Sequence, residues 1–302
     1  MARQPFTNAR NFKAGLFVSV ICLVSASSTN AQKPADSLYH FQSNGNPVIT
    51  HKHTADPGAW VESDTLWLFT GHDFEGKQKG YKMKDWCVFS TTDLKNWTEY
   101  PTPLKVTDFS WDKTGKAYAA QAIKRNGKYY WYISTDGSGI GVAVADRPQG
   151  PSVDALAKPL LTNADCFAST HNWLCIDSSV LIDDDGQAWI FWGNGVCYYA
   201  KLKDNMIEID GQVKKIDFPN FKFTEAPWIH KRKGKYYLSY ATGFPEKIAY
   251  AMSDKIQGPY HYKGILNEIA GNTNTNQQAI VEFKGAAYYL SQWSHTGNRH
   301  QS

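Results

Sequence analysis

The chain has 302 residues, of which 42% are hydrophobic, 14% are aromatic and 20% are charged. This length allows one large single-core domain or two modest ones, and we expect one. Its 32 lysines and arginines and 28 aspartates and glutamates give a net charge of +4 and are scattered along the chain. Because no basic stripe is present, the sequence predicts no nucleic-acid partner.

The first 31 residues read as a cleaved secretory signal. Three basic residues precede an apolar run from Ala14 to Val24, and small side chains follow at positions 29–31. An apolar run of this length is too short to cross a bilayer, which needs roughly 20 residues, so no membrane span is predicted. We therefore expect a secreted or periplasmic protein whose folded domain covers residues 32–302.

The remaining cysteines show no metal-binding pattern. They are Cys87, Cys166, Cys175 and Cys197, and none forms a C-x-x-C pair or lies near the paired histidines of a zinc site. No metal site is predicted. An exported protein permits a disulfide between Cys166 and Cys175, and buried free thiols are an equally good alternative.

A turn followed by an aromatic strand recurs five times along the chain. The five turns begin at Ser63, Asn126, Asp185, Lys233 and Lys284. Their separations of 63, 59, 48 and 51 residues suit four-stranded blades joined by variable loops. A short apolar strand precedes each turn, and no amphipathic helix interrupts the series. The sequence therefore predicts an all-β fold, a five-bladed β-propeller.

The main rival fold is a β-sandwich, which also strings short strands between turns but does not predict a fivefold repeat of this period. The fifth unit is short, because only ten residues follow Gln292. We expect the fifth blade to be incomplete at the C-terminus, unless residues after position 31 supply a missing strand.

Three acidic residues stand at similar places in the repeat. Asp56 lies seven residues before the first turn, Asp177 eight before the third and Glu225 eight before the fourth. The innermost strand of each propeller blade lines the central channel, so residues at its start converge at one face. Glycoside hydrolysis needs such a set, with a protonated acid, an ionised base and a field that separates their pKa values.

The motifs around these acids are Thr54-Ala55-Asp56-Pro57, Ile176-Asp177-Ser178-Ser179-Val180 with Asp183-Asp184-Asp185-Gly186, and Phe223-Thr224-Glu225-Ala226-Pro227-Trp228. Together they strongly resemble glycoside hydrolase family 43, the arabinofuranosidase and β-xylosidase group, and the resemblance covers essentially all of the mature chain. It implies an inverting glycosidase in which Asp56 is the general base, Glu225 is the general acid, and Asp177 raises the pKa of that acid and orients it. Inversion implies base and acid carboxyls roughly 6.5–9.5 Å apart.

Five further residues are candidates for substrate binding. His72 follows the first aromatic strand, Trp111 and Trp228 offer flat faces to sugar rings, and Gln121 and Gln277 lie near the starts of the second and fifth inner strands. For each of them a packing or local hydrogen-bonding role is the alternative.

The chain departs from the family pattern at two places. Where such enzymes often have Asn-His it has Asn276-Gln277-Gln278, and the usual Tyr-His reads Gln292-Trp293. An axial histidine in this family often helps to hold a channel ion. A channel calcium ion is therefore an open question here, and no cofactor is required.

The resemblance implies an exo-acting α-L-arabinofuranosidase or β-xylosidase whose substrate is arabinoxylan, xylan or arabinan. Two alternatives remain open. An endo-arabinanase would have an open groove in place of a pocket, and a non-catalytic carbohydrate-binding propeller would bind glycan without releasing sugar.

Overall fold

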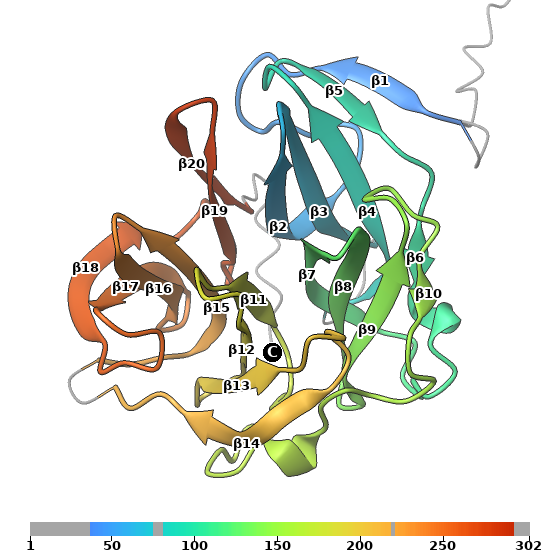
Figure 1. Ribbon diagram of the computed structural model, residues 1–302. Helices are drawn as coiled ribbons and strands as arrows, with labels where there is room; N and C mark the ends of the chain where they lie inside the picture. Colours follow the sequence, from blue (N-terminus) through green and yellow to red (C-terminus); the bar gives the residue numbers. More distant parts are fainter. Residues whose placement is uncertain (1–36, 75–80, 219–220, 293–302) are drawn as a thin grey trace, which may run out of the picture. The chain divides into compact units, whose positions relative to one another are not determined.

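A computed structural model describes residues 37–74, 81–218 and 221–292 (Figure 1). The predicted signal segment, residues 1–31, and Trp293 lie outside these ranges. Within them the chain forms 20 strands and two short 3₁₀ turns, η1 (Val106–Asp108) and η2 (Asn163–Asp165). No helix of this described part is long and apolar enough to span a membrane.

The strands form four antiparallel sheets and one two-stranded hairpin. The first sheet has, in spatial order, β1 (Tyr39–Gln42), β5 (Asn96–Glu99), β4 (Met83–Thr91), β3 (Thr65–Asp73) and β2 (Thr54–Glu62), with β6 (Leu104–Lys105) beside β4. The second has β10 (Val153–Asp154), β9 (Gly139–Ala145), β8 (Lys128–Thr135) and β7 (Ala117–Arg125). The third has β11 (Ser179–Ile182), β12 (Ala188–Trp192), β13 (Tyr198–Leu202) and β14 (Ile209–Lys215). The fourth has β15 (Glu225–Arg232), β16 (Lys235–Thr242), β17 (Lys247–Ser253) and β18 (His261–Asn267), and the hairpin pairs β19 (Gln278–Phe283) with β20 (Ala286–Ser291).

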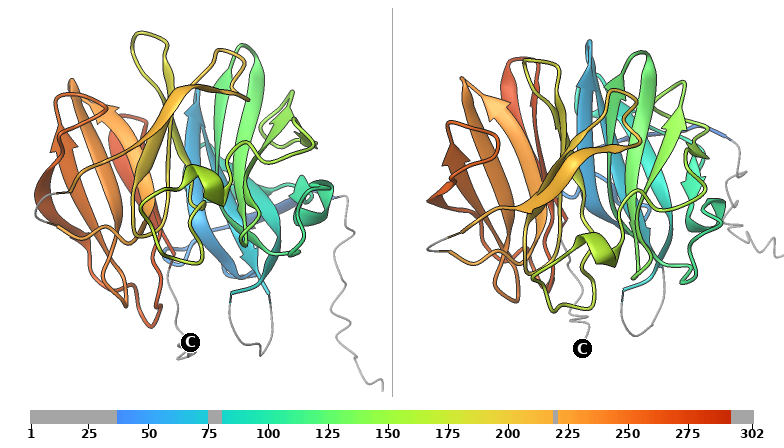
Figure 2. Two further views of the ribbon diagram at one scale, coloured as in Figure 1. Left: turned by 90° about the horizontal axis from the view of Figure 1, so that it is seen from below. Right: turned by 60° about the horizontal axis from the view of Figure 1, so that its bottom comes forward.

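The strands β2, β7, β11, β15 and β19 lie nearest the centre of this domain (Figure 1). β2 packs against β7, β7 against β11, β11 against β15, β15 against β19, and β19 against β2, so the inner strands close a ring. Two further views show the sheets standing around that centre (Figure 2). This arrangement confirms the predicted all-β propeller.

The predicted number of five blades was wrong. The described residues form four blades, and the fifth repeat forms only the hairpin β19–β20, with no third strand paired to β20 in the described ranges. The repeated motif consists of a turn and its two flanking strands, which make a hairpin. It carries no information about the outer strands that turn a hairpin into a blade. The N-terminal segment does not complete the fifth unit either, because β1 pairs with β5 in the first sheet.

The recurrent turns have the backbone that tight hairpins need. Asn126-Gly127, Lys233-Gly234 and Lys284-Gly285 have positive φ at both residues, as type I′ turns require. Glycine adopts this region at no steric penalty, which explains why its position in the motif marks each turn so clearly.

The aromatic residues mainly pack between neighbouring sheets. Trp86 and Trp131 lie in a cluster shared by the first and second sheets, and Tyr132 and Trp192 lie in one shared by the second and third. Fully burying one large apolar side chain contributes about 1.5–3 kcal/mol. These clusters therefore hold the inner strands, and the residues at their ends, in fixed relative positions.

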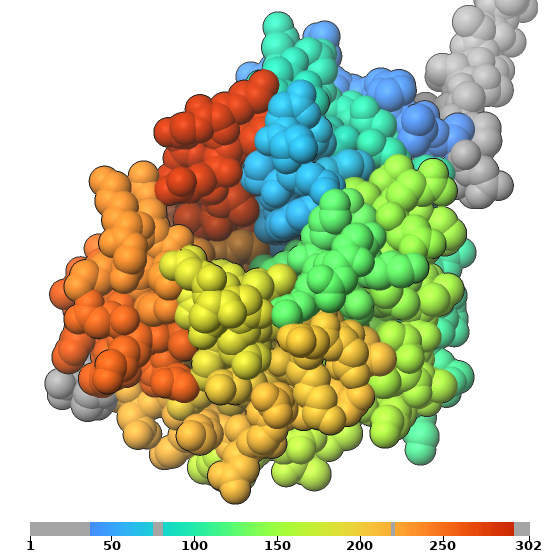
Figure 3. All heavy atoms as spheres, in the orientation of Figure 1, coloured from blue at the N-terminus to red at the C-terminus, as the bar shows by residue number. Residues whose placement is uncertain are grey.

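One face of the domain is hollowed at its centre, between the inner strands (Figure 3). A cavity of about 330 Å³ lies between β2, β7, β11 and β15, and its lining includes Trp60, Lys124, Trp228 and His230. The channel expected in a propeller is thus present between the inner strands of the four blades.

Candidate active site

Asp56, Asp177 and Glu225 lie where the inner strands of the first, third and fourth sheets begin. Asp56 is the third residue of β2, Asp177 precedes β11 by two residues, and Glu225 opens β15. Because these strands pack side by side around one centre, their starts meet at one end of it. The structure therefore brings the three predicted acids together.

The backbone at these positions is irregular. β2 and β15 break register with their partners between Ala55 and Gly58 and between Glu225 and Trp228. Asp56 and Asp177 have φ values of 53° and 59°, which cost a non-glycine residue about 1–2 kcal/mol. Strain of this kind concentrates at functional sites.

The three acids do not occupy one identical position. In the fourth sheet the residue with positive φ is Ala226, at 54°, and Glu225 stands one residue before it. Asp56 and Asp177 are themselves the positive-φ residues of their segments. Counting residues back from the turns placed the acids close to one another but did not reveal this offset.

Neighbouring segments anchor Asp56 and Asp177. The Asp56 N–H donates to Gln292 Oε1 at 2.9 Å, which ties the acid to the end of β20. The Asp177 N–H donates to Ser134 Oγ at 3.0 Å, and Asp177 Oδ2 accepts a hydrogen bond from the Ala226 N–H at 3.1 Å. Asp177 thus connects the second, third and fourth sheets.

The protein raises the pKa of all three carboxyls. Burial is the largest cause in each case, and a neighbouring carboxylate adds to it: Asp177 acts on Asp56, Glu225 acts on Asp177, and Glu246 followed by Asp56 acts on Glu225. Like charges resist joint ionisation, so the cluster keeps protons that isolated carboxyls would lose. A proton donor and a proton acceptor within one small site are what acid–base hydrolysis requires.

Three residues that the sequence analysis missed also belong to this cluster. Glu246 is 1% exposed, and its carboxyl hydrogen-bonds to that of Glu225. The Asn194 side-chain amide donates to Glu225 Oε2. Burial raises the pKa of Tyr81 to about 12, and the nearby charges of Glu225, Glu246 and Asp56 add to the shift.

The order of the strands in the repeat indicates where two of these three residues, Asn194 and Glu246, could have been found in the sequence. In an antiparallel hairpin the end of the second strand lies beside the start of the first, as Ala241 pairs with Glu225. Asn194 and Glu246 lie in the loops that follow the second strands β12 and β16. Polar residues just after each aromatic strand were therefore candidates from the sequence.

Comparison with known proteins agrees with this geometry. The model of the glycosyl hydrolases family 43 matches residues 44–300. The chain belongs to glycosyl hydrolase family 43. It is therefore a glycosidase, as the motifs predicted.

The relatives of this family 43 chain include arabinofuranosidases and xylosidases. An arabinoxylan arabinofuranohydrolase from Paenibacillus polymyxa is 30% identical, over 91% of this chain and 50% of its own length. Xylosidase/arabinosidase 43A from Humicola insolens is 31% identical, over 79% of this chain and 87% of its own. The structure of an α-L-arabinofuranosidase from Clostridium thermocellum matches with 35% identity and a TM-score of 0.70, over 80% of this chain and 83% of that one. The chain thus spans about half the length of the Paenibacillus relative.

Two residues predicted to bind substrate in this family 43 chain hold inner strands together. Gln121 is buried, its Oε1 accepts from the Val180 N–H at 2.5 Å, and its Nε2 donates to the Val180 carbonyl at 3.3 Å, which joins β7 to β11. Trp228 is 5% exposed, and its indole N–H donates to the Ile280 carbonyl at 3.1 Å, which joins β15 to β19. These contacts favour the packing alternative for both.

Trp111 packs on the outer strands of the second sheet. Its indole N–H donates to Asp154 Oδ2 at 3.0 Å, its ring contacts Phe109, and it lies against Gly141 of β9. Gly141 and Asp154 belong to the third and fourth strands counted outward from the centre. Its position therefore gives the substrate-binding prediction no support.

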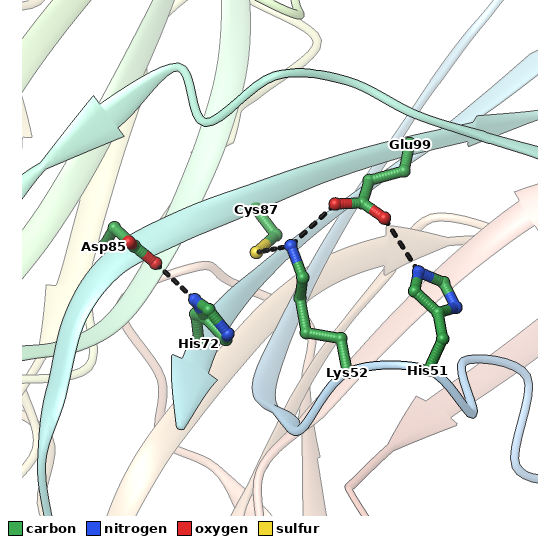
Figure 4. A network of polar contacts seen from close by, with 6 residues as sticks. All are labelled: His51, Lys52, His72, Asp85, Cys87 and Glu99. Atoms are coloured by element: carbon green, nitrogen blue, oxygen red, sulfur yellow. Dashed lines mark hydrogen bonds and ion pairs between the residues drawn. The ribbon is translucent and has the colours of Figure 1, made fainter. Parts of the chain in front are cut away.

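His72 belongs to a polar network on the first sheet (Figure 4). Its Nδ1 lies 2.7 Å from Asp85 Oδ1, and beside it Lys52 Nζ lies 3.8 Å from Cys87 Sγ and 2.6 Å from Glu99 Oε1. One donor atom each from His72, Asp85 and Cys87 lies within 4.8 Å of the others, a spacing that a metal ion accepts. However, burial raises the pKa of the Cys87 thiol to about 12, and the Lys52 ammonium already contacts it. A second cation would meet repulsion here.

At the start of the inner strand β19, near Gln277, the polar side chains that could face a channel ion are amides. Gln277 is half-buried, and the next residue, Gln278, donates from Nε2 to the Ala226 carbonyl at 3.0 Å and to Ser239 Oγ at 3.1 Å. Gln278 Oε1 and both polar side-chain atoms of Asn276 are buried without a hydrogen-bond partner in the described part of the chain. Calcium takes six to eight oxygen ligands, and the unpaired amide oxygens of Asn276 and Gln278 supply only two. The mechanism below therefore includes no metal.

Proposed function

We propose that this protein is an exported, inverting, exo-acting glycosidase that releases α-L-arabinofuranosyl or β-D-xylosyl residues from arabinoxylan or xylan. The observation that carries the proposal is the cluster of Asp56, Asp177 and Glu225 at one end of the channel, where burial and mutual repulsion raise the pKa of each carboxyl. The names of the relatives above support the choice of sugars.

In the proposed reaction Glu225 gives its proton to the glycosidic oxygen as the bond to the anomeric carbon breaks. A water molecule attacks that carbon from the opposite face, and Asp56 takes the proton that this water loses. Glu225 ends as a carboxylate and Asp56 as a carboxylic acid, and exchange with solvent restores both. Asp177 holds the segment that bears Glu225 through its hydrogen bond to the Ala226 N–H.

An aromatic pair beside the acids offers a surface on which a sugar ring can stack. The ring of Trp173 meets that of Tyr81 edge-on, with centroids 6.4 Å apart, and Trp173 is 36% exposed. Since Tyr81 is near Glu225, this contact joins the segment before β4 to the segment before β11 at the acids. Exposed aromatic faces of this kind stack on the apolar faces of sugar rings.

The test is hydrolysis of p-nitrophenyl α-L-arabinofuranoside and p-nitrophenyl β-D-xyloside, with the anomer of the released sugar followed by proton NMR. We expect turnover of at least one compound, release of the inverted anomer, and a loss of at least about 10²-fold in kcat for Glu225→Gln. Glu282→Gln, which removes an exposed carboxylate paired with Arg232, is the matched control and should keep full activity. Full activity of Glu225→Gln, or retention of configuration, would contradict the proposal.

The same assay separates the alternatives. Depolymerisation of linear arabinan without turnover of either small compound would indicate an endo-arabinanase. Binding of xylan or arabinan without any sugar release would indicate a carbohydrate-binding propeller.

A further inference from the structure

A fourth carboxyl, that of Glu246, lies against the proposed acid. Glu246 stands in the loop between β16 and β17, is 1% exposed, and hydrogen-bonds through its carboxyl to the carboxyl of Glu225. The segment before β19 holds it at two points. Glu246 Oε2 accepts from the Asn276 N–H at 2.7 Å, and the Glu246 N–H donates to the Asn274 carbonyl at 2.8 Å.

A hydrogen bond between two carboxyl groups requires a proton on one of them. Glu246 already accepts a backbone N–H from Asn276, and a donor of this kind stabilises the charged form of a carboxyl. Glu225 Oε2 accepts from the Asn194 amide, which leaves Oε1 to carry a proton. When the pair holds a single proton, that proton therefore lies on Glu225, and Glu246 is the carboxylate that accepts its hydrogen bond.

We propose that Glu246 is a positioning residue that keeps the reactive proton on Glu225 and restores it after each turnover. The family resemblance gives Asp177 the role of raising the pKa of Glu225, and Glu246 adds a second carboxyl to that role, so the inference rests on the proposed function. Once Glu246 has ionised, transfer of the Glu225 proton to the leaving oxygen leaves two carboxylates facing each other. Their repulsion favours uptake of a new proton by Glu225.

Burial and the neighbouring carboxylates raise the pKa of both members of the pair. Burial and the Glu246 carboxylate raise the pKa of Glu225, and Asp56 adds to them. Burial raises the pKa of Glu246 to about 8, with Asp177 and Asp56 adding to it and the Asn276 N–H opposing it. The Tyr81 hydroxyl also faces Glu225 and Glu246, and it is neutral at the relevant pH. The adjacent cation Lys247 is paired with Glu268 at 2.6 Å.

The test compares the pH dependence of kcat/KM for the wild-type protein, Glu246→Gln and Glu268→Gln on the better aryl glycoside. Glutamine keeps an oxygen for the Asn276 N–H but brings no negative charge to Glu225. We expect the basic limb of the profile of Glu246→Gln to move to lower pH by at least one unit. KM should change little, and activity at acidic pH should be largely retained. Glu268→Gln removes a surface carboxylate that pairs with Lys247 and should leave the profile in place.

A basic limb that stays in place while kcat falls equally at every pH would show a merely structural role and overturn the inference. Failure of the proposed function is a different result, namely no turnover by the wild-type protein or full activity of Glu225→Gln. An infrared measurement then still tests the pair without activity. The carboxylic acid band lost in Glu225→Gln should titrate at lower pH in Glu246→Gln than in the wild-type protein, and an unchanged midpoint would refute the inference.

Discussion

The buried acid cluster should make stability depend on pH, and Glu246 allows the size of this effect to be worked out. Folding raises the pKa of Glu246 from 4.5 to about 8. A carboxyl whose pKa rises on folding favours the folded state while it is protonated. Its contribution is complete below pH 4.5 and is lost as the pH rises through about 8.

This shift corresponds to about 5 kcal/mol between the two pH limits, because each pKa unit is worth about 1.4 kcal/mol. Glu246→Gln removes the titrating group and keeps the acceptor for the Asn276 N–H. Relative to the wild-type protein it should gain up to about 5 kcal/mol of unfolding free energy between pH 4.5 and pH 9. For a domain of this size that is a rise in Tm of about 10–20 °C at the alkaline end.

The assay is thermal and urea unfolding of both proteins, followed by tryptophan fluorescence from pH 4.5 to pH 9. Glu268→Gln, a change at the surface residue paired with Lys247, is the control, and its difference from the wild-type protein should not vary with pH in this way. A difference between Glu246→Gln and the wild-type protein that is the same at every pH would refute the reasoning. So would a variant that is less stable at pH 9, because burial of an ionising carboxyl would then not be the dominant effect.

Three further changes test the assignments at the inner strands and the rim. Trp228→Phe removes the indole N–H that donates to the Ile280 carbonyl. We expect the unfolding free energy in urea to fall by about 2–4 kcal/mol and KM to stay unchanged. A raised KM with unchanged stability would contradict this. Gln121→Leu leaves the buried Val180 N–H and carbonyl unpaired and should lower the unfolding free energy by about 2–3 kcal/mol, whereas a neutral effect in the same assay would exclude the bridging role. Trp173→Ala removes an exposed aromatic ring and should raise KM for xylo-oligosaccharides at least about tenfold, which corresponds to about 1.4 kcal/mol of binding free energy. Stability should stay nearly that of the wild-type protein. An unchanged KM would show that Trp173 does not belong to the sugar site.

The sequence contained the local part of the site. The turn motif, the alternating strands and the acids Asp56, Asp177 and Glu225 were all readable because each depends on residues close together in the chain. The type I′ turns at Asn126-Gly127 and Lys233-Gly234 illustrate this, since two adjacent residues determine the backbone they need. The family motifs extend the same local information to function.

The roles of single polar and aromatic residues were less readable. Gln121 and Trp228 each suit a sugar site by residue type, and only their partners Val180 and Ile280 reveal that they join neighbouring inner strands. Those partners lie 59 and 52 residues away in the chain. A pattern in the sequence reports which chemistry a side chain offers but not which distant group uses it.

The sequence by itself determined the all-β propeller, the glycosidase motifs and the three acids that carry them, because hairpin chemistry and short motifs act over a few residues. Tertiary structure alone decided the number of complete blades, since outer strands pair with partners that the repeated motif does not specify. It also decided that Glu246, fixed by a backbone N–H 30 residues further along the chain, lies against Glu225. The electrostatics of this site depend on which buried charges the fold brings together, and that depends on long-range packing.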